Sequence, residues 1–158
     1  MAKNPDPALP LRHIDGTLRP LDDWLTMFHF ALVVLPDSPE AVRFVPLARE
    51  IFKVFGDADC RTALLFPSMP SITKRVLGDT VDEIMTFVDP DKELVASLGL
   101  ERLPAFVHLR QDTTLAGVAE GWDPDAWQDV ATELGRAMAW SVPHLTNVRI
   151  PVPAAYPA

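Results

Sequence analysis

The sequence FALVVLPDSPEAVRFVP, residues 30–46, decides the fold of this chain. Its first six residues are all apolar and end at a proline, which is typical of a β-strand buried on both faces. A helix is expected next, because Ser38 is a favourable N-cap and Pro39 suits the first helical position. We expect this helix to reach Phe55 and to kink at Pro46, since an interior proline removes a backbone hydrogen bond.

Outward from this stretch, short apolar runs alternate with amphipathic segments. We expect further strands at 60–67, 84–88, 105–110 and 114–119, and further helices at 20–28, 71–77, 93–98 and from Pro124 to about residue 140. Strands that alternate with helices imply parallel pairs and right-handed crossovers, and the last two strands form an antiparallel hairpin. The sequence therefore predicts a three-layer α/β/α sandwich with a mixed sheet.

The length of 158 residues fits one domain. Proline is unusually frequent, with 16 residues, and half of them lie toward the two ends of the chain. We divide the chain into an N-terminal arm or extended edge segment (1–19), a domain (20–140) and a proline-rich C-terminal tail (141–158).

Composition excludes several classes of protein. No apolar run approaches the ~18 residues of a membrane helix, and the N-terminus has no signal-peptide core, so we expect a cytoplasmic protein. The net charge of −8 argues against nucleic acid and anionic membranes as partners. A single cysteine, Cys60, excludes an internal disulfide and any C-x-x-C pair.

Two proline-containing stretches resemble the thioredoxin-like superfamily, and the resemblance covers about residues 20–140. In that family an apolar strand leads into a C-x-x-C at a helix N-terminus, a proline kinks that helix, and a cis-proline precedes the closing hairpin. Here Ser38 and Ala41 stand where the cysteines would be, Pro46 stands at the kink, and Pro104 stands at the cis-proline position. The resemblance implies a thioredoxin-like fold without its redox motif.

The spacing departs from simple thioredoxins. Pro104 follows Ala41 by 63 positions, which leaves room for one inserted βα element. We assign the surplus to the helix at Ser71–Leu77 and a strand beside it. Peroxiredoxin-like and TlpA-like members of the superfamily carry an extra element of this kind.

The missing cysteines decide the expected chemistry. Dithiol exchange needs a thiolate and a resolving thiol, and Ser38 and Ala41 supply neither. A serine without a neighbouring base is not a nucleophile near neutral pH, so we predict no catalytic residues and no cofactor. The alternative is a single-thiol oxidoreductase or peroxidase that uses Cys60. If the protein is not such an enzyme, we expect Cys60 to be a buried or partly buried structural cysteine.

A binding role is the leading hypothesis. In the family, extended peptide binds between the helix start and the cis-proline loop, which makes Asp37, Ser38, Pro39, Leu103 and Pro104 the candidate groove residues. The implied partner is a protein, bound as an extended peptide or a signal peptide, or met within a larger complex. The implied role is that of an accessory protein, a chaperone or a complex subunit.

A narrower resemblance concerns thioredoxin-like hydrogenase-maturation chaperones, which also lack C-x-x-C. The stretches Leu21–Thr26 and Leu103–Ala105 are similar to theirs, whereas the inserted βα element is a departure. This resemblance implies the signal peptide of a hydrogenase small subunit as the partner.

Four apolar side chains late in the chain are candidates for protein contact: Trp122, Trp140, Val148 and Ile150. Their alternative role is packing beneath the terminal segments. The tail that contains the last two is either disordered or an extended strand on another subunit, since its prolines suit an edge contact.

The remaining polar residues have structural explanations. The four histidines, His13, His29, His108 and His144, are far apart and form no metal-ligand spacing. Acidic clusters fit turns and helix ends, and the glycines form no phosphate-binding loop. The sequence therefore predicts no metal site.

Overall fold

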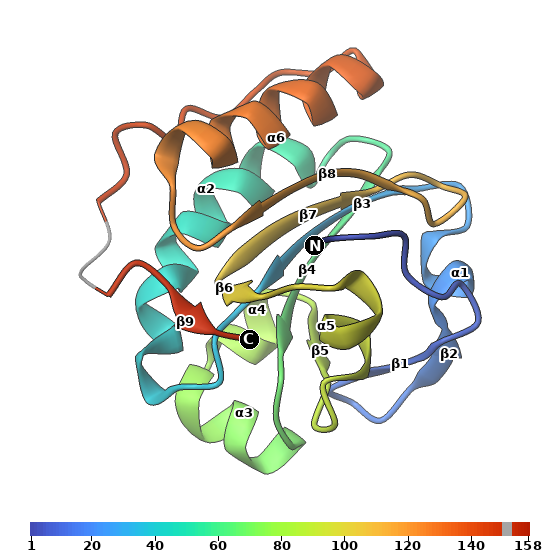
Figure 1. Cartoon of the computed structure of the whole chain (residues 1–158), viewed down its shortest axis with the longest axis vertical. Coiled ribbons are helices and arrows are strands. Elements are labelled where there is room, and N and C mark those ends of the chain that lie inside the picture. Colours follow the sequence, from blue (N-terminus) through green and yellow to red (C-terminus); the bar gives the residue numbers. More distant parts are fainter. Residues whose placement is uncertain (150–152) are drawn as a thin grey trace.

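A seven-stranded mixed sheet crosses the molecule in the order β2-β1-β5-β4-β3-β7-β8 (Figure 1). The computed structural model describes residues 1–149 and 153–158. The strands of this sheet are β1 (Pro10–His13), β2 (Leu18–Pro20), β3 (His29–Val34), β4 (Cys60–Phe66), β5 (Thr86–Val88), β7 (Ala105–Leu109) and β8 (Leu115–Glu120). A separate two-stranded sheet pairs β6 (Arg102–Leu103) with β9 (Tyr156–Pro157).

Six α-helices and one 3-10 helix are present among the described residues. They are α1 (Leu21–Leu25), the 3-10 helix η1 (Pro39–Phe44), α2 (Val45–Phe55), α3 (Pro70–Leu77), α4 (Thr80–Glu83), α5 (Glu93–Leu98) and α6 (Pro124–Met138). None of the described helices is both long and apolar enough to cross a membrane.

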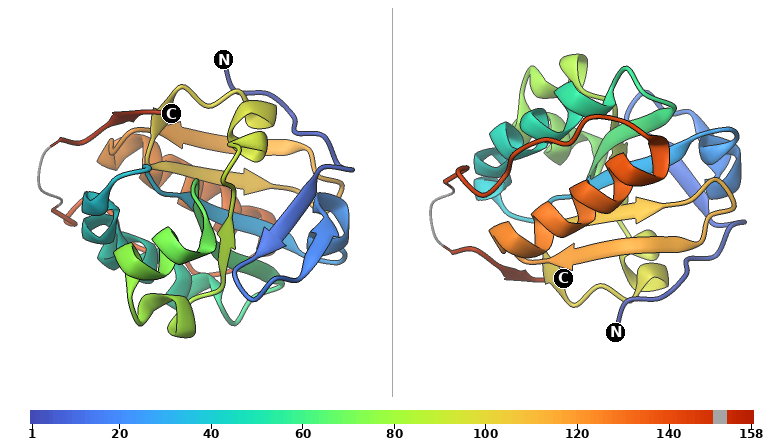
Figure 2. Two further views of the ribbon diagram at one scale, coloured as in Figure 1. Left: turned by 90° about the horizontal axis from the view of Figure 1, so that it is seen from below. Right: turned by 90° about the horizontal axis from the view of Figure 1, so that it is seen from above.

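The central strand β3 is buried on both faces, as its uninterrupted apolar run predicts. It pairs in parallel with β4 and antiparallel with β7. Because side chains alternate along a strand, Ala31 and Val33 join the core beneath α2 and α6, whereas Phe30, Leu32 and Val34 join the core beneath α1 and α5. The two views in Figure 2 show α6 over one face of the sheet and α5 over the other. The predicted three-layer sandwich with a mixed sheet is confirmed.

The predicted kink at Pro46 is wrong, because this proline begins a helix. Ser38 caps the segment as expected, and its Oγ accepts the Glu40 N–H at 3.2 Å. The chain then winds as the 3-10 helix η1, and α2 starts at Val45 with Pro46 in its first turn. A proline lacks the N–H and its ring clashes with the carbonyl four residues back, so the α-helix starts where the proline is tolerated.

The inserted element lies between β4 and α5, and it contains more helix than the sequence indicated. Gly78 ends α3 with a positive φ of 57°, and the short helix α4 follows before β5. β5 extends the sheet by pairing in parallel with β4 and antiparallel with β1. α4 is a single turn, too short to show an apolar periodicity in the sequence.

Both ends of the chain lie against the domain. In the N-terminal segment 1–19, β1 pairs with β5 and with β2, and Leu11 is buried beneath them. In the tail 141–158, the chain turns back along α6, and Leu145 is fully buried. This turn depends on Gly135, because a Cβ there would lie 2.6 Å from Cγ2 of Val142.

Candidate functional site

The predicted groove residues gather at one end of the sheet because of strand register. Val34, at the end of β3, pairs with Ala105, at the start of β7. The loop that leads from β3 into η1 and the loop that leads through Pro104 into β7 therefore lie at the same end of the sheet. The Leu103–Pro104 peptide bond is cis, as expected for the proline at this position.

One half of the candidate site is a pocket of about 300 Å³ beside the start of η1. Asp37, Ser38 and Pro39 line it together with Phe66 from β4. Its further wall comes from α3, which contributes Ile72 and Arg75 among others. The inserted helix is thus part of the candidate site, a role that the sequence alone did not assign to it.

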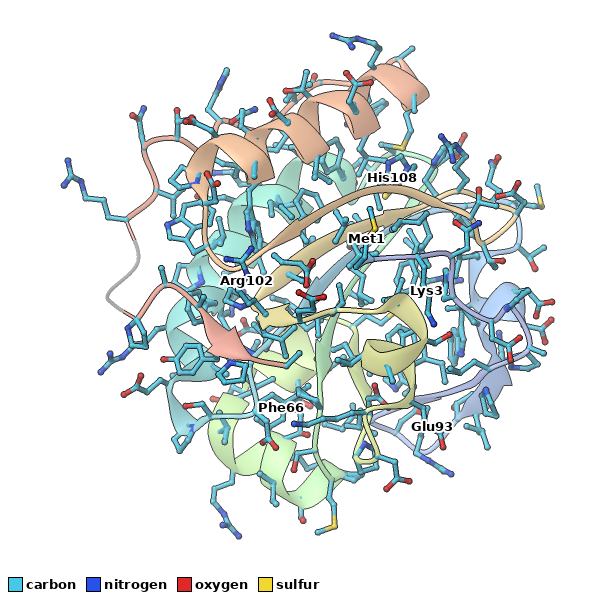
Figure 3. All side chains as sticks on the ribbon, in the orientation of Figure 1. Met1, Lys3, Phe66, Glu93, Arg102 and His108 are labelled. Atoms are coloured by element: carbon cyan, nitrogen blue, oxygen red, sulfur yellow. The ribbon has the colours of Figure 1, made fainter. Side chains whose placement is uncertain are left out.

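The other half of the candidate site is the β6 strand with the cis-proline that follows it, and Leu103 and Pro104 are themselves buried. Here β9 runs antiparallel to β6, with Arg102 opposite Pro157 and Leu103 opposite Tyr156. Figure 1 shows β9, in red, beside β6, and Figure 3 places Arg102 next to this pair and Phe66 nearer to α3. The end of the tail therefore covers the strand that precedes the cis-proline.

Tyr156 joins the two halves. Its ring packs edge-on against Phe44 with the centroids 6.3 Å apart, and its hydroxyl donates to Oε2 of Glu40 at 2.5 Å. This carboxylate raises the pKa of Tyr156. Because Tyr156 also pairs with Leu103, η1 and β6 lie within the reach of one side chain.

Gly121 makes room for the tail. Its φ is +70°, a conformation that side-chain-bearing residues rarely adopt, and a Cβ there would lie 3.1 Å from Cβ of Ala155. Its neighbour Trp122 donates its backbone N–H to the Ala154 carbonyl at 2.6 Å. The loop after β8 thereby fixes the start of the segment that ends in β9.

The candidate contact residues have different surroundings. Trp122 packs edge-on against Trp127 with the ring centroids 5.3 Å apart, and Val148 packs against the core. Trp140 is 41% exposed, and its indole N–H donates to the Val54 carbonyl at 2.6 Å. Ile150 lies outside the described residues. Of the three that are described, only Trp140 presents a large exposed surface.

Cys60 lies at the other end of the sheet from Ser38. It begins β4 and pairs with His29, the first residue of β3. The residue is 7% exposed, and burial raises the pKa of its thiol to about 12. The thiol is therefore protonated at neutral pH and largely out of contact with solvent.

The structure brings together two histidines that the sequence separates by 79 positions. His29 Nδ1 and His108 Nε2 are 2.9 Å apart at the start of β3. His108 is 3% exposed, and burial lowers its pKa to about 4, with the charges of His29 and Arg110 adding to the effect. Only the antiparallel register of β3 and β7 reveals this pair. Among the described residues, no three His, Cys, Asp or Glu side chains gather to hold a metal ion.

Comparisons with known proteins give the fold. The putative thiol:disulfide interchange protein DsbE from Chlorobium tepidum matches with a TM-score of 0.71 and 12% identity, over 87% of this chain and 98% of that one. A putative thioredoxin from Neisseria meningitidis matches with a TM-score of 0.66 and 15% identity, over 88% and 95% of the two chains. Peroxidoxin BcpB from Mycobacterium tuberculosis matches with a TM-score of 0.63 and 19% identity, over 87% and 99%.

At these identities the likeness establishes the fold alone. The chain has the thioredoxin-like fold, and its single cysteine excludes a C-x-x-C motif. No protein-family sequence model matches this chain. A search of curated protein sequences gives no match either.

The buried histidine pair predicts a pH-dependent stability. The folded protein favours the neutral form of His108. The stabilisation that results from this preference is therefore fully present above pH 6.5 and is lost as the pH falls toward 4. The stability difference between the wild type and His108→Gln should therefore shift in favour of the variant by about 1 to 2 kcal/mol between pH 7.5 and pH 5. Urea unfolding of both proteins at the two pH values measures this, and a difference that does not change with pH would contradict it.

Proposed function

We propose that this chain is a redox-inactive, thioredoxin-like binding protein, which recognises an extended segment of a protein partner as an accessory, a chaperone or a complex subunit. One observation carries the proposal. The edge at the cis-proline accepts an antiparallel strand, within reach of the helix start, although no thiol stands there. Edge pairing supplies affinity through the backbone, and neighbouring pockets supply specificity.

The residues at the helix start support binding without chemistry. Ser38 uses its hydroxyl to cap η1, and Ala41 is fully buried. The Ser38 Oγ has no acid–base partner among the hydrogen bonds of the described residues, and a serine needs such a partner to act as a nucleophile. The pocket beside them offers apolar walls, one arginine and one aspartate, which suits a side chain of a bound segment.

The position and burial of Cys60 argue against the alternative of a single-thiol enzyme. A reactive cysteine needs an accessible thiolate, usually stabilised by a helix N-terminus or a nearby cation. Cys60 is buried, its pKa is raised to about 12, and it lies at the opposite end of β3 from the candidate site.

Cys60 should therefore be labelled slowly in the folded protein. The thiolate fraction at pH 7.5 falls about tenfold for each unit by which the pKa rises, so the folded protein should react at least 100 times more slowly with monobromobimane than the protein in 6 M guanidinium. Time-resolved fluorescence of both samples measures the ratio. Folded-state labelling as fast as in denaturant would revive the enzyme hypothesis.

A role in hydrogenase maturation is a narrower form of the proposal, with the signal peptide of a small subunit as the extended segment. It rests on the resemblance of Leu21–Thr26 and Leu103–Ala105. In the structure, packing accounts for the first of these stretches, because Leu21, Trp24 and Leu25 are buried and the Trp24 indole N–H donates to the Leu11 carbonyl at 3.0 Å.

Site-specific photo-crosslinking in the native host tests the proposed function. A benzophenone amino acid at Pro39, which is exposed beside the pocket, should give one discrete adduct, and mass spectrometry of that adduct identifies the partner. Met27 is the matched control, because it is 77% exposed and lies before β3, at the other end of that strand. The same adducts at both positions, or none at Pro39, would contradict the proposal.

A further inference from the structure

Without residues 154–158, one edge of β6 would have no partner strand. A strand edge offers backbone groups that pair readily with any extended segment. In this structure, residues 154–158 supply that segment. Its first backbone contact is the bond from Trp122 to Ala154, and its last is the 3.1 Å bond from the Ala158 N–H to the Glu101 carbonyl.

The prolines of the segment are compatible with this pairing. Positions in an antiparallel ladder alternate between bonded and non-bonded, so the neighbour of a bonded position turns its N–H away from the partner strand. Ala158 donates to Glu101, and Pro157 therefore occupies a position where the ladder needs no N–H. The outer side of β9 in turn lacks a donor at Pro157, which discourages a further strand.

The segment lies on the surface of the domain, and burial of its side chains contributes little to holding it there. Pro153, Ala155 and Pro157 are exposed, and Ala154, Tyr156 and Ala158 are half-buried. Leu145, earlier in the same tail, is fully buried. Segments with few buried contacts open at the lowest free-energy cost, so the end of the tail can leave β6 without unfolding the domain.

We propose that residues 154–158 occupy in cis the docking edge for the partner, and that the partner is an extended segment which displaces them by presenting small residues followed by a tyrosine. The small residues are required at Gly121, where Ala155 already lies at close range. The tyrosine is required between Phe44 and Glu40, where Tyr156 places its ring and its hydroxyl.

Tethering sets the size of the effect. A segment on the same chain competes at an effective concentration of about a millimolar or more, and the apparent affinity for a second segment falls by the fraction of molecules whose edge is free. Weakening the tail should therefore strengthen the binding of an added segment by about 10- to 100-fold.

The test uses the full-length protein and a fluorescein-labelled peptide with the sequence of residues 149–158, followed by fluorescence anisotropy. The Tyr156→Ala variant should bind this peptide about tenfold more tightly than the wild type does. Tyr156→Phe, which loses only the hydroxyl, should lie between them. Asn147→Ala is the matched control, because this exposed tail residue lies outside the segment, and it should bind as the wild type does.

A second variant keeps the inference testable if Tyr156→Ala has a small effect. A chain that stops after residue 152 should bind the peptide 10- to 100-fold more tightly than the full chain, and a peptide with alanine at the tyrosine position should bind it at least fivefold more weakly. Circular dichroism and thermal unfolding establish that each variant is folded, and if the shortened chain is not, the comparison among the full-length variants decides.

Three results would overturn the inference. Folded variants that bind the peptide no better than the wild type show that the tail does not compete for the edge. Equal binding of the alanine peptide shows that the tyrosine is not recognised. A full chain that is dimeric and becomes monomeric on shortening shows that the segment is exchanged between copies.

This inference rests on the proposed function, but the two fail separately. The peptide measurement requires no natural partner, so it can succeed where crosslinking finds none. A crosslinked partner that binds the wild type and Tyr156→Ala equally well would uphold the proposed function and contradict the cis competition.

Discussion

The pairing of β3 with β7 is the constraint on which the rest of the site depends. β3 is apolar from Phe30 to Val34 because helices cover both faces, and its alternating side chains fill the two cores in the observed register. That register sets Val34 beside Ala105. It thereby brings the start of η1 and the cis-proline loop to the same end of the sheet. A shift of one residue would exchange the β3 side chains between the two cores and move Val34 out of line with Ala105.

The start of η1 carries no cysteine. The Ser38 hydroxyl instead caps η1, and the one thiol of the chain, that of Cys60, lies buried at the far end of β3. Beside the start of η1 lies the edge of β6, and a strand edge pairs readily with another extended segment unless it is protected. Residues 154–158 cover it, with Gly121 making the space and Tyr156 linking it to Glu40. The helix start without a cysteine and the covered strand edge thus lie at one place.

Local signals in the sequence were sufficient for most elements, and the resemblance to the thioredoxin-like superfamily identified Pro104 as the cis-proline. Apolar runs located β3, β4 and β7, and Asp123 with Pro124 located the start of α6. The predicted kink at Pro46 was wrong because the position of a proline alone does not distinguish a kinked helix from a 3-10 helix followed by a new α-helix. The contacts of Tyr156 and the pair of His29 with His108 join residues that are distant in sequence, and no local pattern contains them. The wall that α3 gives to the pocket is hidden for the same reason.

The central claim is that the edge at β6 and the start of η1 form one binding site. Chemical-shift mapping of the ¹⁵N-labelled protein during titration with the peptide of residues 149–158 measures this directly. We expect the largest changes to centre on Glu40, Leu103 and Trp122, and the signal of Tyr156 to move toward that of a free tail. Changes centred instead on His29, Cys60 and Trp140, at the opposite end of the sheet, would contradict it.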